Sequence, residues 1–335
     1  MNLVFELSGE KTEIGLEEVK SVLEVFEIDY KVICFEDPIL VIEVEEIDLN
    51  ILRNRLAFTH SISNLISISE NIEGLIDSAS NLETDLTYSV RANQKKVNKP
   101  IKNMDVESKV GSAISGDVDL ESPGVRFQVF ITNRCFFLTE KFFDINKKEF
   151  RRRKPNLRPF FKPGAVKPKF ARGIVNLLGL TKRDYLLDLF SGTGSYLLEA
   201  SLIGCRAIGV DIELDMLEGM LDNFRSIDEE VNCILGDSRF LPVQDSSVDA
   251  VVMDPPYGRS SGYRAGSLSE LYEKALRESI RVLRGNGRLC VITPKKSRFS
   301  INKGYKLEKV SKFEVRVHRN LTRDIKIFKR CKYND

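Results

Sequence analysis

The segment VVMDPPYGRSSGY, at positions 251–263, carries a chemically distinctive group of residues. An apolar run that ends in Asp-Pro-Pro-Tyr predicts a buried strand followed by a carboxylate, a proline carbonyl and an aromatic ring. Asp254 and the Pro255 carbonyl could accept both N–H groups of a delocalised amine, which frees its lone pair for attack on an electrophile. Asp254 could also take the released proton, and Tyr257 offers a face for stacking a base. The alternative is a Pro-Pro turn that ends an edge strand.

A glycine turn lies upstream, in the segment YLLDLFSGTGSYLLEA at positions 185–200. Gly192 and Gly194 allow a tight turn and leave room for a ligand against the start of the following helix. A dinucleotide-binding turn would have a third glycine near position 197, where this chain has Leu197. The turn therefore predicts a cofactor site, with a purely structural turn as the alternative.

Two further predicted strands end in acidic residues. Asp211 ends the segment CRAIGVD and is followed by Ile212; its two oxygens could accept both hydroxyls of a ribose. Asp237 and Ser238 follow the next strand, where Asp237 could accept a hydrogen bond from an adenine amino group. Helix capping or a turn would explain both aspartates without any ligand.

These residues require a scaffold of alternating strands and helices, which the second half of the chain predicts. Strands are expected at 184–189, 205–210, 231–235, 247–253 and 286–292, with helices at 167–179, 194–203, 213–225 and 267–283 and final strands near 305–317 and 322–330. Such alternation is typical of a doubly wound α/β domain.

The first half predicts smaller α+β units. Residues 1–58 show strands at 3–7, 30–36 and 39–44 and helices at 15–27 and 48–55, a pattern with ferredoxin-like character. A second unit at 59–145 has helices at 69–79 and 104–115 and strands at 85–92, 125–132 and 135–140. Residues 146–166 are proline-rich and form a linker, and 167–335 form the α/β domain.

Charge is unevenly distributed along the chain. Residues 1–50 hold 14 acidic and 3 basic side chains, whereas residues 146–172 hold 11 basic side chains and one acid. Five basic residues and no acid occur in 91–103. This pattern favours a nucleic-acid partner over simple surface solvation. The side chains predicted to contact RNA are Arg151, Arg152, Arg153, Lys154, Lys95 and Lys96.

Composition narrows the class of protein. The chain is 42% hydrophobic, enough for ordinary cores. It has neither the run of about 18 apolar residues that a membrane helix needs nor the start of a signal peptide, so a cytoplasmic location and no membrane contact are expected. The six cysteines are scattered without a CxxC pair, and there are two histidines, so free thiols and no metal site are expected.

Taken together, the motifs resemble those of THUMP-containing RNA guanine-N2 methyltransferases, and most closely the archaeal tRNA (guanine(10)-N2)-methyltransferase family. The segments that carry the resemblance are RPFFKPGAVKPKFARGIVNL (158–177), DLFSGTGS (188–195), GVDIE (209–213), GDSRFLP (236–242), DPPYGRSS (254–261) and VHRNLTRDIKIF (317–328). They cover most of residues 147–330. In the first half, the THUMP assignment depends on the order of elements alone.

The resemblance implies a Rossmann-like class I methyltransferase domain preceded by an α+β ferredoxin-like/THUMP RNA-binding module. It also implies S-adenosyl-L-methionine as cofactor, with Asp188 and Phe190 joining the glycine turn in the cofactor site. The implied substrate is tRNA, methylated once or twice on guanosine 10. Some family members work with a small zinc-binding activator subunit. The chain departs from the family at Lys162, where histidine is usual, and at Leu189-Phe190-Ser191, where Pro-Phe-Cys is usual.

Other functions remain open at this point. An rRNA guanine-N2 or a DNA adenine-N6 methyltransferase would use the same Asp-Pro-Pro-Tyr motif. An RNA-binding protein with an inactive catalytic fold would share the charge pattern. An NAD-dependent oxidoreductase is disfavoured by Leu197 and by the lack of a basic catalytic residue near the fourth strand.

Overall fold

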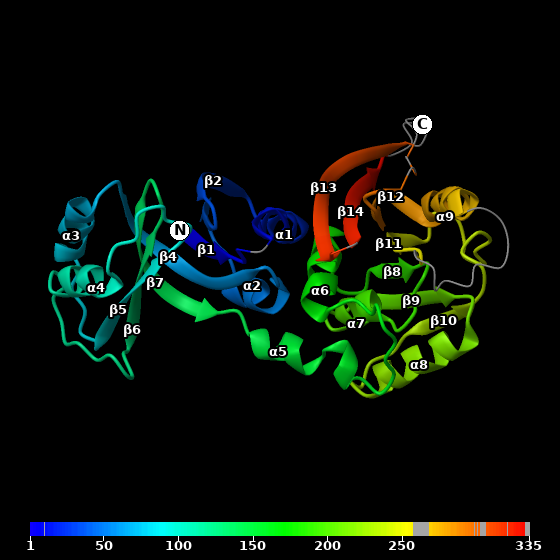
Figure 1. The fold of residues 1–335 in the computed structure, drawn as a ribbon, viewed down its shortest axis with the longest axis horizontal. Coiled ribbons are helices and arrows are strands. Elements are labelled where there is room, and N and C mark those ends of the chain that lie inside the picture. Colours follow the sequence, from blue (N-terminus) through cyan, green and yellow to red (C-terminus); the bar gives the residue numbers. More distant parts are fainter. Residues whose placement is uncertain are drawn as a thin grey trace. The chain divides into compact units, whose positions relative to one another are not determined.

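The chain forms two compact units in the computed structural model, which describes residues 1–9, 11–256, 268–297, 299, 301, 306–319 and 321–331 (Figure 1). The first unit comprises Met1–Val19 and Glu27–Asn146, and the second comprises Lys20–Phe26 and Lys147–Asp335. No helix in the described part of the chain is long and apolar enough to cross a membrane.

The first unit is built on a seven-stranded sheet with the order β2-β3-β1-β4-β7-β6-β5. Only β5 and β6 pair in parallel; the other neighbours are antiparallel. The strands are β1 (Asn2–Leu7), β2 (Tyr30–Glu36), β3 (Ile39–Val44), β4 (Thr59–Ser69), β5 (Tyr88–Gln94), β6 (Val125–Ile131) and β7 (Phe136–Asp144). The helices before residue 146 are α1 (Thr12–Val25), α2 (Leu49–Arg55), α3 (Ile72–Ser80) and α4 (Asn103–Gly111).

Strand β4 is central to this sheet, although no strand was expected at its position. Its sequence, THSISNLISIS, is rich in serine, which is depleted in most buried strands. The buried Ser63 hydroxyl donates to Gln128 at 3.3 Å, and the Ser61 hydroxyl donates to Glu6 at 2.8 Å. Since β4 pairs with β1 on one side and β7 on the other, strands from residues 1–58 and 59–145 share one sheet.

The second unit contains a mixed seven-stranded sheet with the order β10-β9-β8-β11-β12-β14-β13. The first five strands in this order are parallel, and β14 and β13 are antiparallel to their neighbours. The strands are β8 (Tyr185–Asp188), β9 (Arg206–Asp211), β10 (Asn232–Leu235), β11 (Val248–Met253), β12 (Leu283–Pro294), β13 (Leu307–His318) and β14 (Leu321–Arg330). The helices are α5 (Lys147–Arg152), the 3-10 helix η1 (Pro155–Leu157), α6 (Pro168–Leu177), α7 (Ser195–Ser201), α8 (Leu214–Arg225) and α9 (Leu268–Val282).

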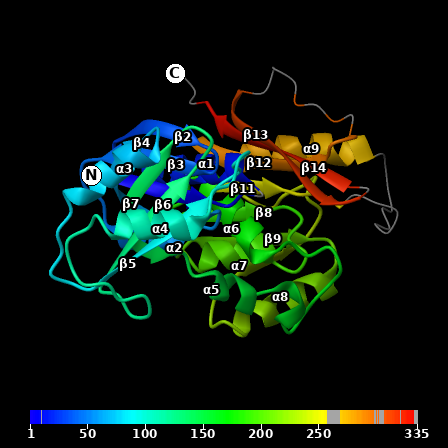
Figure 2. The ribbon, with the colours of Figure 1, turned by 60° about the vertical axis from the view of Figure 1, so that its left-hand side comes forward.

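Helices cover both faces of this second sheet. Leu187, Val251 and Met253 join an apolar cluster with residues of α9. Because successive strand residues point to opposite faces, Val252 and Asp254 belong to the other face. Figures 1 and 2 show α9 on one side of the strands and α6 with α7 on the other. Asp254, which follows β11, therefore lies on the face of the sheet that α7 covers.

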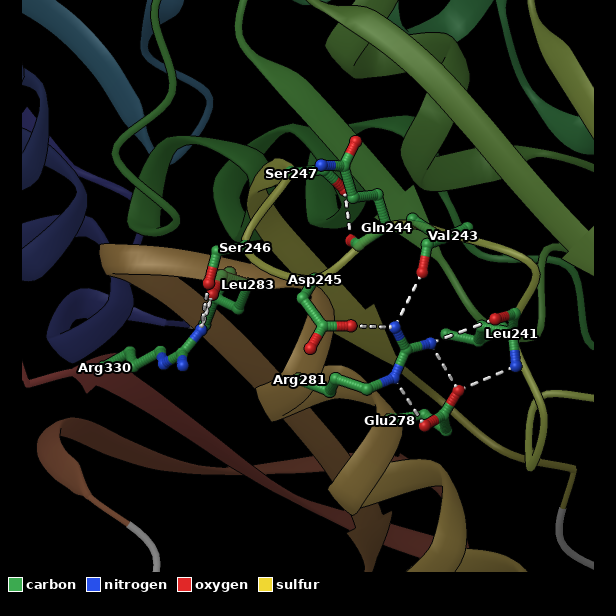
Figure 3. A network of polar contacts seen from close by, with 10 residues as sticks. All are labelled: Leu241, Val243, Gln244, Asp245, Ser246, Ser247, Glu278, Arg281, Leu283 and Arg330. Carbon is green, nitrogen blue, oxygen red and sulfur yellow. Dashed lines mark hydrogen bonds and ion pairs between the residues drawn. The ribbon is translucent and has the colours of Figure 1, made fainter.

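Arg281, in the last turn of α9, connects that helix to the segment before β11 (Figure 3). Its guanidinium donates to the backbone oxygens of Leu241 at 3.0 Å and Val243 at 2.7 Å. It also contacts Asp245 at 2.5 Å and Glu278 at 2.7 Å. Glu278 in turn accepts the Leu241 N–H at 2.7 Å. The network thus fixes where β11 begins. It thereby also fixes how far along the sheet the strand ends and where the residues after it lie.

We expect Arg281→Ala to destabilise the second unit by about 2 kcal/mol, because two backbone oxygens and two carboxylates lose their shared donor. The matched control is Arg277→Ala on the same helix, whose exposed pair with Glu273 is worth at most about 0.5 kcal/mol. Urea denaturation followed by circular dichroism measures both. Equal midpoints for the two variants would contradict the structural role of Arg281.

Candidate active site

Aspartates end three adjacent parallel strands of the second sheet. Asp188 is the last residue of β8, Asp211 is the last of β9, and Asp254 follows β11 directly. Strand β8 lies between β9 and β11, and the connections leave β8 in opposite directions, so a topological switch point lies between β8 and β11. In open α/β sheets ligands bind at the carboxyl ends of strands at such a point. The sheet therefore brings three of the predicted site residues to its binding edge.

The glycine turn between β8 and α7 adopts a left-handed backbone at both predicted glycines. Gly192 has φ +49° and Gly194 has φ +80°. A Cβ on Gly194 would lie 2.7 Å from Met220 Cγ, so glycine is needed there for packing. A Cβ on Gly192 would meet nothing nearer than the Phe190 oxygen at 4.0 Å, so the turn leaves open space at Gly192.

Asp188 is almost completely buried, with 1% of its surface exposed. Its Oδ1 accepts the N–H of Phe190 at 3.1 Å, which shapes the turn. Burial raises the pKa of the Asp188 carboxyl to about 8, and the neighbouring Asp254 and Asp211 carboxylates add to the rise. A buried carboxyl with so high a pKa is suited to bind a cationic group, since a cation would compensate its charge.

Asp211 links β9 to the glycine turn. Its Oδ2 accepts the Gly192 N–H at 2.8 Å, and its Oδ1 accepts the Glu213 N–H at 3.0 Å. Burial raises its pKa. Ile212 beside it is 68% exposed, which leaves an apolar surface next to the carboxylate.

Asp237 is held by an arginine from its own loop. Arg239 contacts Oδ2 through Nη2 at 2.5 Å and Oδ1 through Nε at 3.0 Å, and this pairing lowers the pKa of Asp237. The neighbouring Ser238 is buried. An adenine amino group at this position would therefore share Asp237 with Arg239.

The predicted catalytic carboxylate, Asp254, contacts two residues from other elements. The Tyr196 hydroxyl of α7 donates to Asp254 Oδ2 at 2.9 Å. The Arg323 guanidinium of β14 lies 3.6 Å from the same oxygen, and the exposed fractions of the two side chains are 13% and 9%. Pro255 is buried, while Tyr257 lies outside the described residues.

The predicted RNA-contacting side chains differ in their surroundings. Lys95 contacts Glu6 at 2.6 Å and Lys96 contacts Asp37 at 2.5 Å, so acidic partners compensate both charges. Three others are exposed at the surface of the second unit, namely Arg151, Arg152 and Lys154. Of these, Arg152 contacts Glu149 at 3.1 Å in a pair that is exposed to solvent.

Arg153 has a structural contact that the sequence did not indicate. Its guanidinium binds both oxygens of the fully buried Glu199 at 3.0 and 3.1 Å, and Arg172 contacts the same carboxylate at 3.0 Å. The pair attaches the segment after α5 to α7. A single glutamate in the apolar helix SYLLEAS was the available signal, since a buried acid requires a cationic partner.

A cavity of about 440 Å³ opens beside this ion pair. Arg158 lines it, donating to the Ser195 hydroxyl at 3.0 Å, and burial lowers the pKa of Arg158 to about 10. The full lining is Arg152, Arg153, Leu157, Arg158, Pro159, Leu198, Glu199, Asn223, Ser226 and Ile227. The cavity combines a basic rim with apolar walls.

Two contact residues of Asp254 were missed at the sequence level. Tyr196 is a polar residue in an otherwise apolar helix start, and Arg323 lies in a segment that the family resemblance included without a role. At Lys162, where the family usually has histidine, the side-chain Nζ lies 3.5 Å from Asp215 Oδ2 at the start of α8. Among the residues that the structure describes, no cluster could hold a metal ion, and the six cysteines are free.

Comparisons with known proteins match this architecture along its length. A family model described as "RMKL-like, methyltransferase domain" matches residues 155–325. The tRNA (guanine(10)-N2)-dimethyltransferase of Methanothermobacter thermautotrophicus is 33% identical over 98% of this chain and 100% of its own. TrmN from Thermus thermophilus aligns with a TM-score of 0.58 and 18% identity over 98% of this chain and 100% of its own. SMU.472, solved in complex with SAH, aligns with a TM-score of 0.51 and 14% identity over 99% of each chain. The predicted fold class is thereby confirmed.

We expect Asp188→Asn to stabilise the ligand-free protein increasingly as the pH rises. A carboxyl with a folded pKa near 8 and an unfolded pKa of about 3.9 ionises first in the unfolded chain. The wild type therefore loses stability between these two pH values, whereas asparagine does not. The gain should reach on the order of 3–5 kcal/mol near pH 8 and be small near pH 4.

Urea denaturation of the two proteins at several pH values between these limits measures the difference. The control is Asp222→Asn, whose side chain is 57% exposed and whose effect should not change with pH. A constant difference between Asp188→Asn and wild type would show that Asp188 is not buried as a protonated acid.

Proposed function

Because the chain belongs to the tRNA (guanine(10)-N2)-dimethyltransferase family, we propose that it methylates the N2 amino group of guanosine 10 in tRNA, once or twice. The observation that carries the proposal is the Asp254 carboxylate, anchored by Tyr196 at the switch-point edge where Asp188 and the glycine turn also lie. The proposed substrate, guanosine 10 of tRNA, is the one in the name of the relative that matches along its full length.

The proposed cofactor is S-adenosyl-L-methionine, and the residues at the strand edge fit it. The Asp188 carboxyl suits its ammonium, the open side of Gly192 leaves room for its methionine part, and the Asp211 oxygens suit the ribose hydroxyls. Phe190, Gly194, Ile212, Asp237 and Ser238 complete the proposed cofactor site. When bound, the cofactor supplies an electrophilic methyl group on a sulfonium.

The chain's own residues prepare the amine for this transfer. The lone pair of guanine N2 is delocalised into the ring, so the free amine is a poor nucleophile. Asp254 and the Pro255 carbonyl accept its two N–H groups and favour the pyramidal form. After transfer the nitrogen carries a positive charge, and it loses one proton to the Asp254 carboxylate. Tyr257 stacks on the base, which leaves its helical position at a cost of a few kcal/mol.

RNA affinity is proposed to come from the exposed basic residues near the cavity. Arg151, Arg152 and Lys154 can neutralise backbone phosphates, whereas Arg153 is committed to Glu199. Such contacts position the RNA and carry little sequence information. Lys95 and Lys96 contribute from the first unit, with partly compensated charge. The partner is thus tRNA in the cytoplasm, and the boundaries 1–58, 59–145, 146–166 and 167–335 remain our proposed domains.

The direct test is incubation of an unmodified tRNA transcript with methyl-labelled cofactor, followed by nucleoside mapping. The proposal predicts N2-methylguanosine and N2,N2-dimethylguanosine at position 10. Label in adenine, or in rRNA but not tRNA, would favour the alternative enzymes. No label, with or without cell extract to supply a zinc-binding activator subunit, would leave an inactive RNA-binding protein as the better explanation.

We expect Asp254→Asn to lower kcat by on the order of 10³-fold, because the uncharged amide oxygen is a weaker acceptor of the amine N–H and cannot take the proton. Affinity for tRNA and for S-adenosylhomocysteine should change less than about twofold, since the residue acts on the transition state. Single-turnover kinetics and equilibrium titrations measure the two effects. Transfer at the wild-type rate would exclude Asp254 as the catalytic carboxylate.

We expect the double variant Arg151→Ala/Arg152→Ala to weaken tRNA binding and to reduce the slope of log K against log salt by about 1–2. The matched control is Arg277→Ala/Arg284→Ala, two exposed arginines in α9 and at the start of β12, which should leave the slope unchanged. Filter binding over a salt series measures both. Identical slopes for all three proteins would remove Arg151 and Arg152 from the RNA interface.

A further inference from the structure

The Asp254 carboxylate is held through one oxygen by two groups from distant parts of the chain. The Tyr196 hydroxyl, in the first turn of α7, lies 2.9 Å from Oδ2, and the Arg323 guanidinium, on β14, lies 3.6 Å from the same atom. Tyr196 is 3% exposed and Arg323 13% exposed at the side chain. A hydrogen bond to a charged group in such a setting is stronger than one in water.

An ionised carboxylate at this position requires such support. Asp254 has 9% of its side chain exposed, so desolvation opposes its ionisation. The proposed chemistry needs the ionised form, because a carboxylate is the stronger acceptor of an amine N–H and it alone can later take the proton. The Tyr196 O–H and the Arg323 cation are the groups that favour the charged form.

We propose that Tyr196 is a positioning residue for methyl transfer: its hydroxyl keeps the Asp254 carboxylate ionised and turned toward the substrate amine. The inference rests on the proposed function of Asp254 and adds to it a residue from the glycine-turn helix. Because α7 begins at that turn, one short helix shapes the cofactor site through Gly194 and orients the acceptor of the substrate through Tyr196.

The hydroxyl is a donor at every working pH. Burial raises the pKa of Tyr196 well above its ordinary value, and the nearby Asp254 charge raises it further. Among the described residues, the titratable and charged groups that act on the Asp254 carboxylate come from five different elements: Asp188, Tyr196, Tyr272, Cys290 and Arg323. Of these, Tyr196 donates a hydrogen bond to Asp254 Oδ2.

Tyr272, on α9, provides a matched control. Its ring is 1% exposed, and burial followed by the Asp254 charge raises its pKa to about 12, so it lies in the same electrostatic field. Its hydroxyl has no hydrogen-bond partner among the described residues. Tyr272→Phe therefore removes the same atom from the same neighbourhood without removing a bond to Asp254.

The kinetic test compares Tyr196→Phe with Tyr272→Phe at saturating tRNA and S-adenosylmethionine. We expect Tyr196→Phe to lower the plateau rate about tenfold with both KM values unchanged. Because a hydrogen bond to the carboxylate lowers its pKa, its loss should move the acid limb of the pH–rate profile about one unit higher. Tyr272→Phe should match the wild type. Equal profiles for Tyr196→Phe and wild type, or equal shifts in both variants, would overturn the proposal.

A second measurement does not depend on catalysis. Protein labelled with 13C at its aspartate carboxylates, with Asp254→Asn to assign the resonance, reports the titration of Asp254 directly. We expect the apparent pKa to rise by about one unit in Tyr196→Phe and to stay unchanged in Tyr272→Phe. If the wild type methylates no RNA, the proposed function fails. The titration still shows whether the hydrogen bond from Tyr196 lowers the Asp254 pKa.

If Tyr196→Phe does not fold, a variant that keeps the ring and the hydroxyl can show in which direction the hydroxyl shifts the Asp254 pKa. Replacing Tyr196 with 3-fluorotyrosine gives a more acidic phenol and a stronger donor, so the Asp254 pKa should fall and the acid limb should move to lower pH. A shift in the other direction, or none, would show that the hydroxyl does not support the charge on Asp254.

Discussion

Three parallel strands of the second unit end in aspartates at one edge of the sheet. The rest of the site depends on which groups stabilise each of these carboxyl groups. Backbone N–H groups of the glycine turn and the start of α8 stabilise Asp211. Tyr196 and Arg323 stabilise Asp254. Asp188 accepts the Phe190 N–H, but burial still raises its pKa to about 8, so Asp188 is the carboxyl that gains most from a bound cation.

The arginines of residues 146–172 also differ in whether their charge is buried and paired or exposed to solvent. A charge that is buried must be paired, so Arg153 and Arg172 bind Glu199 and hold α7 in place. Arg151 and Arg152 are exposed, and the pair of Arg152 with Glu149 is accessible to solvent, so a polyanion can reach both arginines. Helix α7 thus has one connection to the basic segment through Glu199 and another to the proposed catalytic carboxylate through Tyr196. A contiguous stretch of positive charge in a sequence does not have a single role.

Much of the second unit could be predicted because its strands are continuous apolar runs and its turns carry glycine, proline and aspartate at fixed offsets. The predicted strands at 205–210 and 247–253 match β9 and β11 within a residue. Strand β4 was missed because its buried serines find partners, Glu6 and Gln128, that are distant in sequence. Tyr196 and Arg323 were missed as contacts of Asp254 for the same reason: the sequence shows residue types, whereas these bonds depend on which strands the sheet places together.

The central claim is that the edge formed by β8, β9 and β11 is the methyl-transfer centre. A crystal structure of the protein with S-adenosylhomocysteine tests it most directly. The account predicts the ligand ammonium at Asp188, the ribose hydroxyls at Asp211, and the sulfur facing Asp254 across a space open to a base. A ligand bound elsewhere, or an Asp254 carboxylate turned away from the sulfur, would contradict it.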